Sequence, residues 1–275
     1  MIRRAQPWLG TLVDITALAH AMPEAAVQAA IGHAFDEVAL VHRLMSFHDS
    51  ASDVTRFNRA PCGVLAGLHA HTWTLLQLAE QVRMLSGGMF DVACAPQLVA
   101  WGYLPAPQAI APRRASAPIL RCGPDGTVEK LAPGWIDLGG IAKGYAVDLA
   151  VAALRAAGVA SGCVNAGGDV RVFGDQAFSI CVRDPRALCS ADVVLDLSNE
   201  ALATSGSYFS ARRHGALTVS ALLDGRSGKA LTMEGSVSVR APRCAVADAL
   251  TKLVAASGDC GHTALAALDA CAFII

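Results

Sequence analysis

Residues 136–174, IDLGGIAKGYAVDLAVAALRAAGVASGCVNAGGDVRVFG, decide the fold of this chain. Ala142 to Ala157 carries apolar residues at helical spacing, and Gly158 follows where a helix commonly ends in a left-handed glycine. The segment from Cys163 to Phe173 then has two short apolar runs, separated by a pair of glycines and an acid. This stretch therefore predicts a glycine turn, a long helix and a pair of strands in succession.

The turn before this helix has the composition of an anion site. Gly139 and Gly140 come first, and Lys143 falls in the first helical turn. Unpaired N–H groups and the positive end of the helix dipole favour anions there, and glycine lets a ligand approach the backbone. A purely structural strand-to-helix turn is the competing interpretation. The spacings of the Walker loop and of the Rossmann fingerprint are both absent.

Composition indicates a globular protein with a large core. The chain has 275 residues, of which 53% are hydrophobic and 16% charged, and its formal net charge is −1. This balance disfavours disorder, nucleic-acid binding and attraction to anionic membranes. No apolar run is long enough to span a bilayer.

The cysteines and the N-terminus predict a cytoplasmic location. Nine cysteines are scattered along the chain without a C-x-x-C pair, which favours free thiols in a reducing compartment. Met1 to Arg4 resembles the basic start of a signal peptide, but Asp14 interrupts the apolar segment that follows.

The remaining periodicity predicts one α+β domain over residues 1–275, with mixed or antiparallel sheets and packed helices. A loop region with short strands is expected over 104–134 and a turn over 203–208. The expected strands are 8–18, 178–182, 192–197, 216–223, 234–240 and 272–275. The expected helices, besides the central one, are 24–44, 70–86, 97–101, 244–257 and 262–268.

The central stretch also resembles the signature of a known family. D-L-G-G-I-A-K-G-Y-A-V-D followed by V-N-A-G-G-D-V-R-V-F-G looks like the FAD:protein FMN transferases, the ApbE-like flavin transferase family. Stretches resembling the same family occur in the same order along nearly the whole chain. They are WLGTLVDIT at 8–16, Met45–Phe47 with 52–58, GGMFDVACAPQLVAWGY at 87–103, ALATSGSYFS at 201–210 and CAVADALTKLV at 244–254.

The resemblance implies an enzyme that moves FMN from FAD to a Thr or Ser hydroxyl of an acceptor flavoprotein and releases AMP. FAD is then a substrate, and the implied cofactor is Mg²⁺ on the pyrophosphate oxygens. Hard oxygen ligands suit this ion, which keeps several waters and few protein ligands.

Residue roles follow from the matched motifs, as the resemblance implies them. The flavin and adenosine pockets would be shaped by Met45, Phe47, Asp91, Asn165 and Asp169. The diphosphate would lie beside Gly139, Gly140, Lys143 and Thr204. The metal would be held by the side chains of Asp248 and Thr251 and by the carbonyl of Ala142. The implied catalytic residues are Asp224 and Lys143.

Two departures from the family pattern concern the chemistry directly. The family has a histidine where this chain has Ala221, and general-base assistance is typically worth ~10²–10⁴-fold in rate. The family also has a metal-binding threonine four residues after the position of Asp248, where this chain has Lys252, with Thr251 one residue earlier. Thr251 lies on the same helix face and could still reach the ion, whereas the Lys252 ammonium could stand where the metal charge would be.

These departures leave two further hypotheses open. The first is an FAD-binding protein of the same fold with impaired or lost transferase activity. The second is an FAD pyrophosphatase, in which water replaces the acceptor hydroxyl and free FMN is released.

Overall fold

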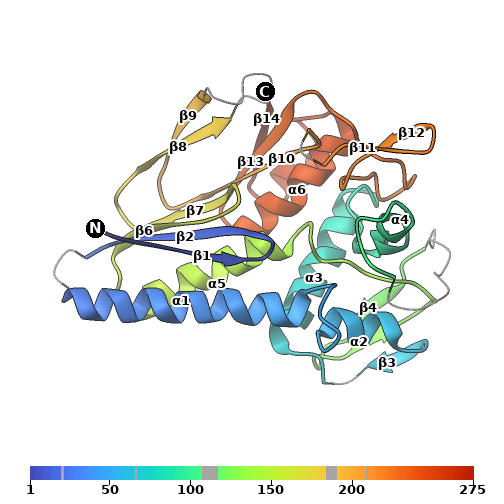
Figure 1. Cartoon of the computed structure of the whole chain (residues 1–275), viewed down its shortest axis with the longest axis horizontal. Helices are drawn as coiled ribbons and strands as arrows, with labels where there is room; N and C mark the ends of the chain where they lie inside the picture. The colour runs from blue at the N-terminus through green and yellow to red at the C-terminus, as the bar shows by residue number, and fades with distance from the viewer. Residues whose placement is uncertain (20–21, 66, 107–116, 184–190, 209) are drawn as a thin grey trace.

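The computed structural model describes residues 1–19, 22–65, 67–106, 117–183, 191–208 and 210–275. A seven-stranded sheet forms its centre, and every pair of neighbouring strands in it is antiparallel (Figure 1). Across the sheet the order is β1 (Ile2–Trp8), β2 (Thr11–Leu18), β6 (Ser161–Ala166), β7 (Asp169–Phe173), β10 (Ala201–Gly206), β13 (Ser236–Ala241) and β14 (Cys271–Ile274).

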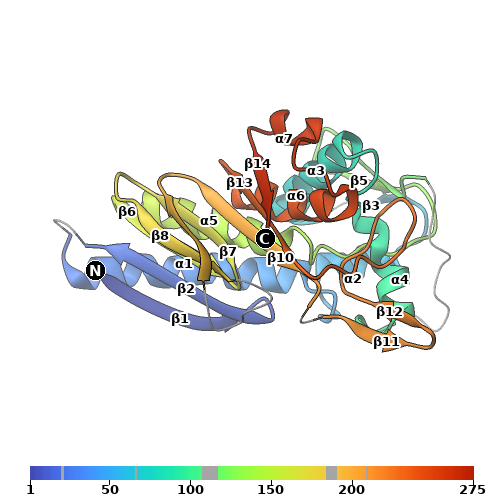
Figure 2. The ribbon, with the colours of Figure 1, turned by 90° about the horizontal axis from the view of Figure 1, so that it is seen from above.

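Helices α1, α5 and α6 pack along one face of this sheet (Figure 1). Figures 1 and 2 both place helices α2 to α4, with β3 to β5, at the opposite end of the molecule from the β8–β9 ribbon. The helices are α1 (Glu24–Met45), α2 (Asp53–Arg59), α3 (Ala70–Leu85), η1 (Val92–Cys94), α4 (Ala95–Ala100), α5 (Ala142–Ala156), α6 (Cys244–Ser257) and α7 (Thr263–Ala266). The remaining strands are β3 (Gly63–Leu65), β4 (Leu120–Cys122), β5 (Val128–Lys130), β8 (Phe178–Arg183), β9 (Ala191–Leu197), β11 (Arg212–His214) and β12 (Leu217–Val219).

The strands alternate between two hydrophobic cores. Val164 and Phe173 point into the main core beneath the helices. Their neighbours Cys163 and Val172 point to the other face, into a smaller core closed by the β8–β9 ribbon. Successive strand residues face opposite sides of a sheet, so a sheet covered on both faces needs apolar residues at consecutive positions. This explains the nearly continuous apolar runs in β6 and β7.

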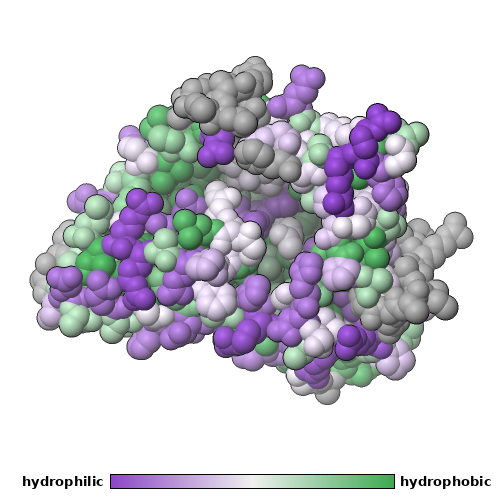
Figure 3. Space-filling model, in the orientation of Figure 1, coloured by the Kyte–Doolittle hydropathy of each residue, from purple (hydrophilic) through white to green (hydrophobic). Residues whose placement is uncertain are grey.

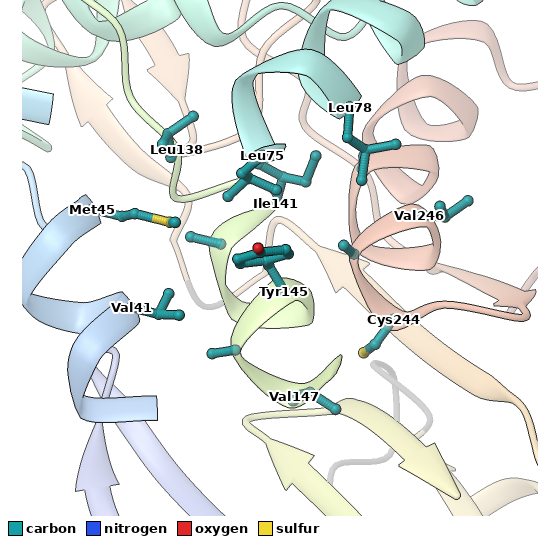
Figure 4. Packing of buried hydrophobic residues seen from close by; sticks show 14 of the residues in the cluster. Val41, Met45, Leu75, Leu78, Leu138, Ile141, Tyr145, Val147, Cys244 and Val246 are labelled. Atoms are coloured by element: carbon teal, nitrogen blue, oxygen red, sulfur yellow. The ribbon is translucent and has the colours of Figure 1, made fainter. Parts of the chain in front are cut away.

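Helix α5 is covered by other helices on several sides. Figure 4 shows Tyr145 of α5 between Met45 of α1, Leu75 of α3 and Cys244 of α6. A helix that is covered on several sides keeps few polar positions, which accounts for the almost entirely apolar sequence of α5.

Helices α5 and α6 approach each other at a glycine. A Cβ atom on Gly144 would lie 2.3 Å from the carbonyl oxygen of Cys244, closer than two such atoms can approach. The Gly144 N–H donates to Asp248 Oδ2 over 3.1 Å at the same crossing. Glycine is therefore required here by the close approach of two backbones, with no need for an unusual dihedral angle.

The α+β class predicted from the sequence is confirmed, and helices occupy most of 24–44, 70–86, 142–157 and 244–257 as expected. The predicted strand 8–18 begins at the wrong residue, because the observed strand β2 starts at Thr11. Leu9 and Gly10, with φ of 56° and 71°, form a two-residue turn between β1 and β2. Strand β1 lacks an apolar run because it is an edge strand, where the Pro7 nitrogen needs no partner strand.

The second half of the chain contains two further corrections. Residues 203–206 of the predicted turn 203–208 belong to strand β10, because Thr204 and Ser205 pair with Ser238 and Val237 of β13. The predicted strand 216–223 is limited to β12, which pairs only with β11, and the predicted helix 262–268 is limited to α7. Residues 107–116 of the predicted loop region lie outside the described residues, as does Cys189. None of the described helices combines the length and the hydropathy needed to cross a bilayer.

We expect Gly144→Ala to lower the free energy of unfolding by about 1–3 kcal/mol, because the added methyl group must push α5 and α6 apart. Gly32→Ala is the matched control: it also lies inside a helix, but its Cβ would meet no atom within 4 Å. The control should stabilise the protein by about 0.5–1 kcal/mol through helix propensity. Urea denaturation of both variants measures the difference, and equal effects would show that the crossing is not tight.

Candidate functional site

Two neighbouring cavities open beside the first turn of α5. The α4 cavity, of about 420 Å³, is lined by residues of the η1–α4 segment, the 137–143 segment, the end of β10 and the loop after β12. The α1 cavity, of about 470 Å³, is lined by the β1–β2 turn, the end of α1 and the same 137–143 segment. Both cavities are lined by Leu104, Asp137, Gly139 and Lys143.

The shared lining makes one elongated cleft of the two cavities. Figure 3 shows the surface hollowed between the β1–β2 hairpin and the part of the molecule that carries α4. Each cavity is within the size range of small-molecule and cofactor sites, roughly 300–1,000 Å³. The cleft therefore suits a long ligand that has a bulky group at each end and its middle at Lys143.

The segment that joins the cavities is held rigidly from behind. The Asn58 amide of α2 accepts from Ile136 N over 2.7 Å and donates to Ile136 O over 3.0 Å. Asp137 N donates to Val92 O over 2.8 Å, and the Asp137 carboxylate accepts from Gly139 N over 3.2 Å. Burial raises the pKa of the Asp137 carboxyl, against the hydrogen bond from Gly139 and the charges nearby.

A four-charge cluster lies at the floor of the cleft and consists of Lys143, Asp169, Asp248 and Lys252. The Lys143 Nζ atom is 2.7 Å from Asp169 Oδ2 and 3.4 Å from Asp248 Oδ2. The Lys252 ammonium binds Asp248 Oδ1 and also donates to the Asp248 carbonyl oxygen over 2.9 Å. The Asp248 side chain is fully buried, whereas Lys143 is 28% exposed and Lys252 is 13% exposed. The two ammonium groups thus face the cleft and the two carboxylates lie behind them.

The cluster holds the charges of its members in place. Burial raises the pKa of Asp169 to about 6, with repulsion from Asp248 in the same direction and attraction to the lysines against it. For Asp248, the nearby Lys143 and Lys252 outweigh burial and lower the pKa. Burial would lower the pKa of Lys143, but Asp169 and Asp248 raise it above its ordinary value. The attraction between Lys143 and the two carboxylates therefore favours the charged forms of all three groups.

Hydroxyl groups from β10, β13 and α6 surround the cluster. Thr251 Oγ1 donates to the Asp248 carbonyl over 2.7 Å and lies 2.8 Å from Ser205 Oγ. Thr204 Oγ1 lies 2.8 Å from Ser238 Oγ on the neighbouring strand. Thr204 and Ser205 line the α4 cavity, whereas Thr251 is fully buried.

Asp148 of α5 fixes α6 relative to this cluster. Its carboxylate accepts from Cys244 N over 2.9 Å and from Ala245 N over 3.0 Å, which are the first two N–H groups of α6. Arg171 of β7 binds the same carboxylate over 2.6 Å. A side chain from one helix thus serves as the N-terminal cap of another, although the α6 cap residue itself, Arg243, makes no side-chain cap hydrogen bond.

Comparison with known proteins identifies the family. A model of the ApbE family matches residues 9–275. This chain belongs to the ApbE family. It is 33% identical over 199 residues to the FAD:protein FMN transferase of Rhodobacter capsulatus, an alignment that covers 67% of this chain and 38% of that protein. It is 26% identical over 226 residues to the FAD:protein FMN transferase of Vibrio cholerae, covering 76% of this chain and 68% of that one.

Solved structures share the ApbE fold. The ApbE protein of Thermotoga maritima superposes with a TM-score of 0.83 at 24% identity, covering all of this chain and 94% of that one. The flavin transferase ApbE of Vibrio cholerae gives a TM-score of 0.79 at 24% identity, with 100% and 93% coverage. At this identity the superpositions establish the fold, and the chemistry has to be argued from the residues of the cleft.

Most residues expected from the ApbE resemblance lie in or directly behind the cleft. Those lining the α4 cavity are Asp91, Gly139, Gly140, Lys143 and Thr204, and those lining the α1 cavity are Met45, Phe47, Gly139, Ala142 and Lys143. Asp169, Asp248 and Thr251 form the layer behind the lysines. Ala221, at the position of the family histidine, lines the α4 cavity.

Two expected residues have a different place. Asn165 Oδ1 accepts from Gly168 N over 2.9 Å, so its side chain holds the β6–β7 turn that presents Asp169. Asp224 accepts from Arg226 N over 3.0 Å and from Ser227 Oγ over 2.8 Å, and it is not among the residues that line the two cavities. Asp224 therefore shapes the loop that carries Ala221.

Two cleft residues were missed by the sequence analysis. Asp137 precedes Gly139 in the same motif, and its acidic side chain next to a glycine turn was an available signal. Ser205 lies next to Thr204 on β10, and its partner Thr251 is 46 residues away. Because that pairing depends on the packing of α6 against β10, no local sequence pattern predicts it.

We expect Asp148→Asn to lower the free energy of unfolding by about 1.5–3 kcal/mol, because the new amide group turns a donor toward the N–H groups of α6 or toward Arg171. Glu200→Gln is the control, since Glu200 also pairs with an arginine, Arg240, over 2.7 Å but is more exposed. A loss of about 0–1 kcal/mol is expected there. Chemical denaturation of the two variants decides, and a loss for Asp148→Asn no larger than the control's would contradict the capping role.

Proposed function

We propose that this protein transfers FMN from FAD to a Thr or Ser hydroxyl of an acceptor flavoprotein and releases AMP. Its membership of the ApbE family and the activity named for its relatives support this assignment. The chain spans 38% of the length of the Rhodobacter relative and 68% of the Vibrio relative, so the argument depends on the cleft itself.

The reaction is a phosphoryl transfer between two oxygens. The acceptor hydroxyl oxygen forms a bond to the phosphorus of the FMN half, and the bond between that phosphorus and the bridging oxygen breaks. The bridging oxygen leaves with AMP, and the hydroxyl proton passes to a base or to solvent. Such transfers depend mainly on positioning and on stabilising charge at the phosphoryl oxygens.

The observation that carries the proposal is the position of the Lys143 ammonium group between the two cavities, with Lys252 beside it in the α4 cavity. An FAD molecule with its isoalloxazine in one cavity and its adenosine in the other would place its diphosphate near Lys143. Both Gly139 and Gly140 line the α4 cavity and place no side chain between its space and the start of α5. Lys143 and Lys252 supply positive charge at the same point.

The cleft lacks a histidine that could remove the proton of the acceptor hydroxyl at the position where the family has one. Ala221 has no ionisable group, and Asp137 is the cleft carboxylate whose pKa burial raises. This observation favours a second candidate function, an FAD-binding protein of the same fold with slow or lost transfer. The two candidates share the binding step and differ only in the turnover of FAD.

The resemblance also implies magnesium at Asp248, Thr251 and the Ala142 carbonyl, but the residues present do not fit it. Both Asp248 oxygens are engaged by lysine ammonium groups, and the Thr251 hydroxyl donates to a backbone carbonyl. A magnesium ion at these residues requires Lys252 to leave Asp248 first. Within the described part of the chain, no three His, Cys, Asp or Glu side chains gather to hold a metal ion.

Intact mass spectrometry tests the assignment directly. The protein is incubated with FAD and an acceptor domain that a known family member flavinylates, in MgCl₂ and in EDTA. An acceptor that gains one FMN less water, with one AMP released, is expected. FAD binding without mass gain supports the binding-protein candidate, and free FMN without a modified acceptor supports the pyrophosphatase.

The cytoplasmic location stays a prediction that cell fractionation can test.

We expect Ala221→His to raise the rate of FMN transfer by up to ~10²–10⁴-fold, because an imidazole at this cavity wall can accept the hydroxyl proton. The Kd for FAD should stay nearly constant, which separates proton removal from binding. Lys229→His is the control, since it places an imidazole on the same exposed loop but outside the cavity lining. Equal rates for both variants and the unmodified protein would reject proton removal as the slow step.

A further inference from the structure

The Lys252 side chain occupies the place at Asp248 that a cation would take. It extends from α6 with its stem against the 139–140 turn, where a Cβ on Gly140 would lie 3.5 Å from Lys252 Cε. Its ammonium group binds two oxygens of one residue, the Asp248 carboxylate Oδ1 and the Asp248 carbonyl oxygen. A carboxylate and a backbone carbonyl are also the kinds of oxygen that hold hard divalent ions. The geometry thus shows a positive charge already seated on these oxygens.

The rest of the donor set is committed elsewhere. Asp248 Oδ2 accepts from Gly144 N over 3.1 Å and faces Lys143 Nζ at 3.4 Å. Thr251 Oγ1 donates its proton to the Asp248 carbonyl and pairs with Ser205. A divalent ion would have to displace an ammonium group and would then add two positive charges beside the displaced one.

Charge balance favours the same conclusion. The four-charge cluster is neutral as it stands, with two carboxylates compensated by two ammonium groups. A diphosphate with two negative charges can be received by the cleft-facing sides of Lys143 and Lys252, each of which has further N–H donors to offer. The buried carboxylates hold both lysines in position.

We propose that the Lys252 ammonium serves as the resident cation at Asp248, so that Lys143 and Lys252 together bind the diphosphate of FAD without a divalent metal ion. This inference rests on FAD being the ligand, as proposed above. It goes further in assigning the electrostatic role of an ion to a side chain of this chain. Lysine supplies a point charge and hydrogen-bond donors to phosphoryl oxygens.

The first test is the metal dependence of FAD binding by the unmodified protein. After dialysis against EDTA, flavin fluorescence titrations give the Kd for FAD in EDTA and in excess MgCl₂. We expect the two values to agree within about twofold, since no charge-assisted contact of the diphosphate depends on the ion. A Kd at least tenfold weaker in EDTA would overturn the proposal and establish a metal site instead.

Variants of Lys252 then assign the effect to its charge. Lys252→Met should weaken FAD binding by about 10- to 100-fold in both buffers, the range expected for losing a charge-assisted hydrogen bond. Lys252→Thr should bind as weakly in EDTA but recover with MgCl₂, because it frees Asp248 and adds a hydroxyl ligand. Lys252→Arg keeps the charge and should bind FAD more tightly than Lys252→Met. If Lys252→Met binds FAD in EDTA as tightly as the unmodified protein, Lys252 does not bind the diphosphate.

A matched control and a second readout guard against misfolding. Lys229→Met removes a lysine from an exposed loop outside both cavities and should leave the Kd unchanged. Mn²⁺ binding, followed by electron paramagnetic resonance with FAD present, should be negligible for the unmodified protein and appear in Lys252→Thr. Tight Mn²⁺ binding by the unmodified protein would contradict the proposal, whatever the stability of the variants.

The same titrations separate this inference from the proposed function. Metal-independent FAD binding without FMN transfer leaves the role of Lys252 standing and removes the transferase. FMN transfer that stops in EDTA together with FAD binding keeps the transferase and removes the role of Lys252. No FAD binding in either buffer overturns both.

Discussion

The close approach of α5 and α6 is the constraint on which the cleft depends. Gly144 leaves no room for a side chain against the Cys244 carbonyl, and Asp148 of α5 caps the first N–H groups of α6. The first contact sets the distance between the two helices, and the second fixes where α6 begins relative to α5. Because Lys143 lies on α5 and Asp248 on α6, the distance between these two side chains follows from this packing, whereas Lys252 reaches Asp248 from one turn further along α6 itself. The same packing seats α5 and α6 on β7 and β10, which present Asp169 and Ser205.

Burial of four charges at this crossing has a structural consequence. A buried ion pair gains little net stability, but losing one partner leaves an uncompensated charge and is costly. The cluster therefore contributes more to specifying one arrangement of α5, α6 and β7 than to overall stability. It also keeps two partly exposed ammonium groups at the cleft, each paired with a carboxylate behind it.

Local patterns account for much of the fold but for less of the site. The helices α1, α5 and α6 were predicted because their apolar spacing is long and regular, and the 139–143 turn was recognised from its glycines and lysine. Strand β1 was missed because an edge strand needs no apolar run, and β10 was taken for a turn because small residues suit either. The bonds of Asn58 to Ile136 and of Ser205 to Thr251 join distant segments, so only the folded chain reveals them.

The two departures from the family pattern lie at one cavity but affect different steps. In the proposed function Lys252 would supply charge to the diphosphate, and its stem lies against Gly140. In the same proposal Ala221 would affect proton removal, and it has no contact with the charged cluster among the described interactions. Binding and transfer are therefore separable in this chain. A protein that keeps the binding half through its own lysine and weakens the transfer half through an alanine would hold FAD without a metal and turn it over slowly. The two candidate functions would then share one binding mechanism and differ in the rate of FMN transfer. The presence or absence of a base at residue 221 would decide that rate.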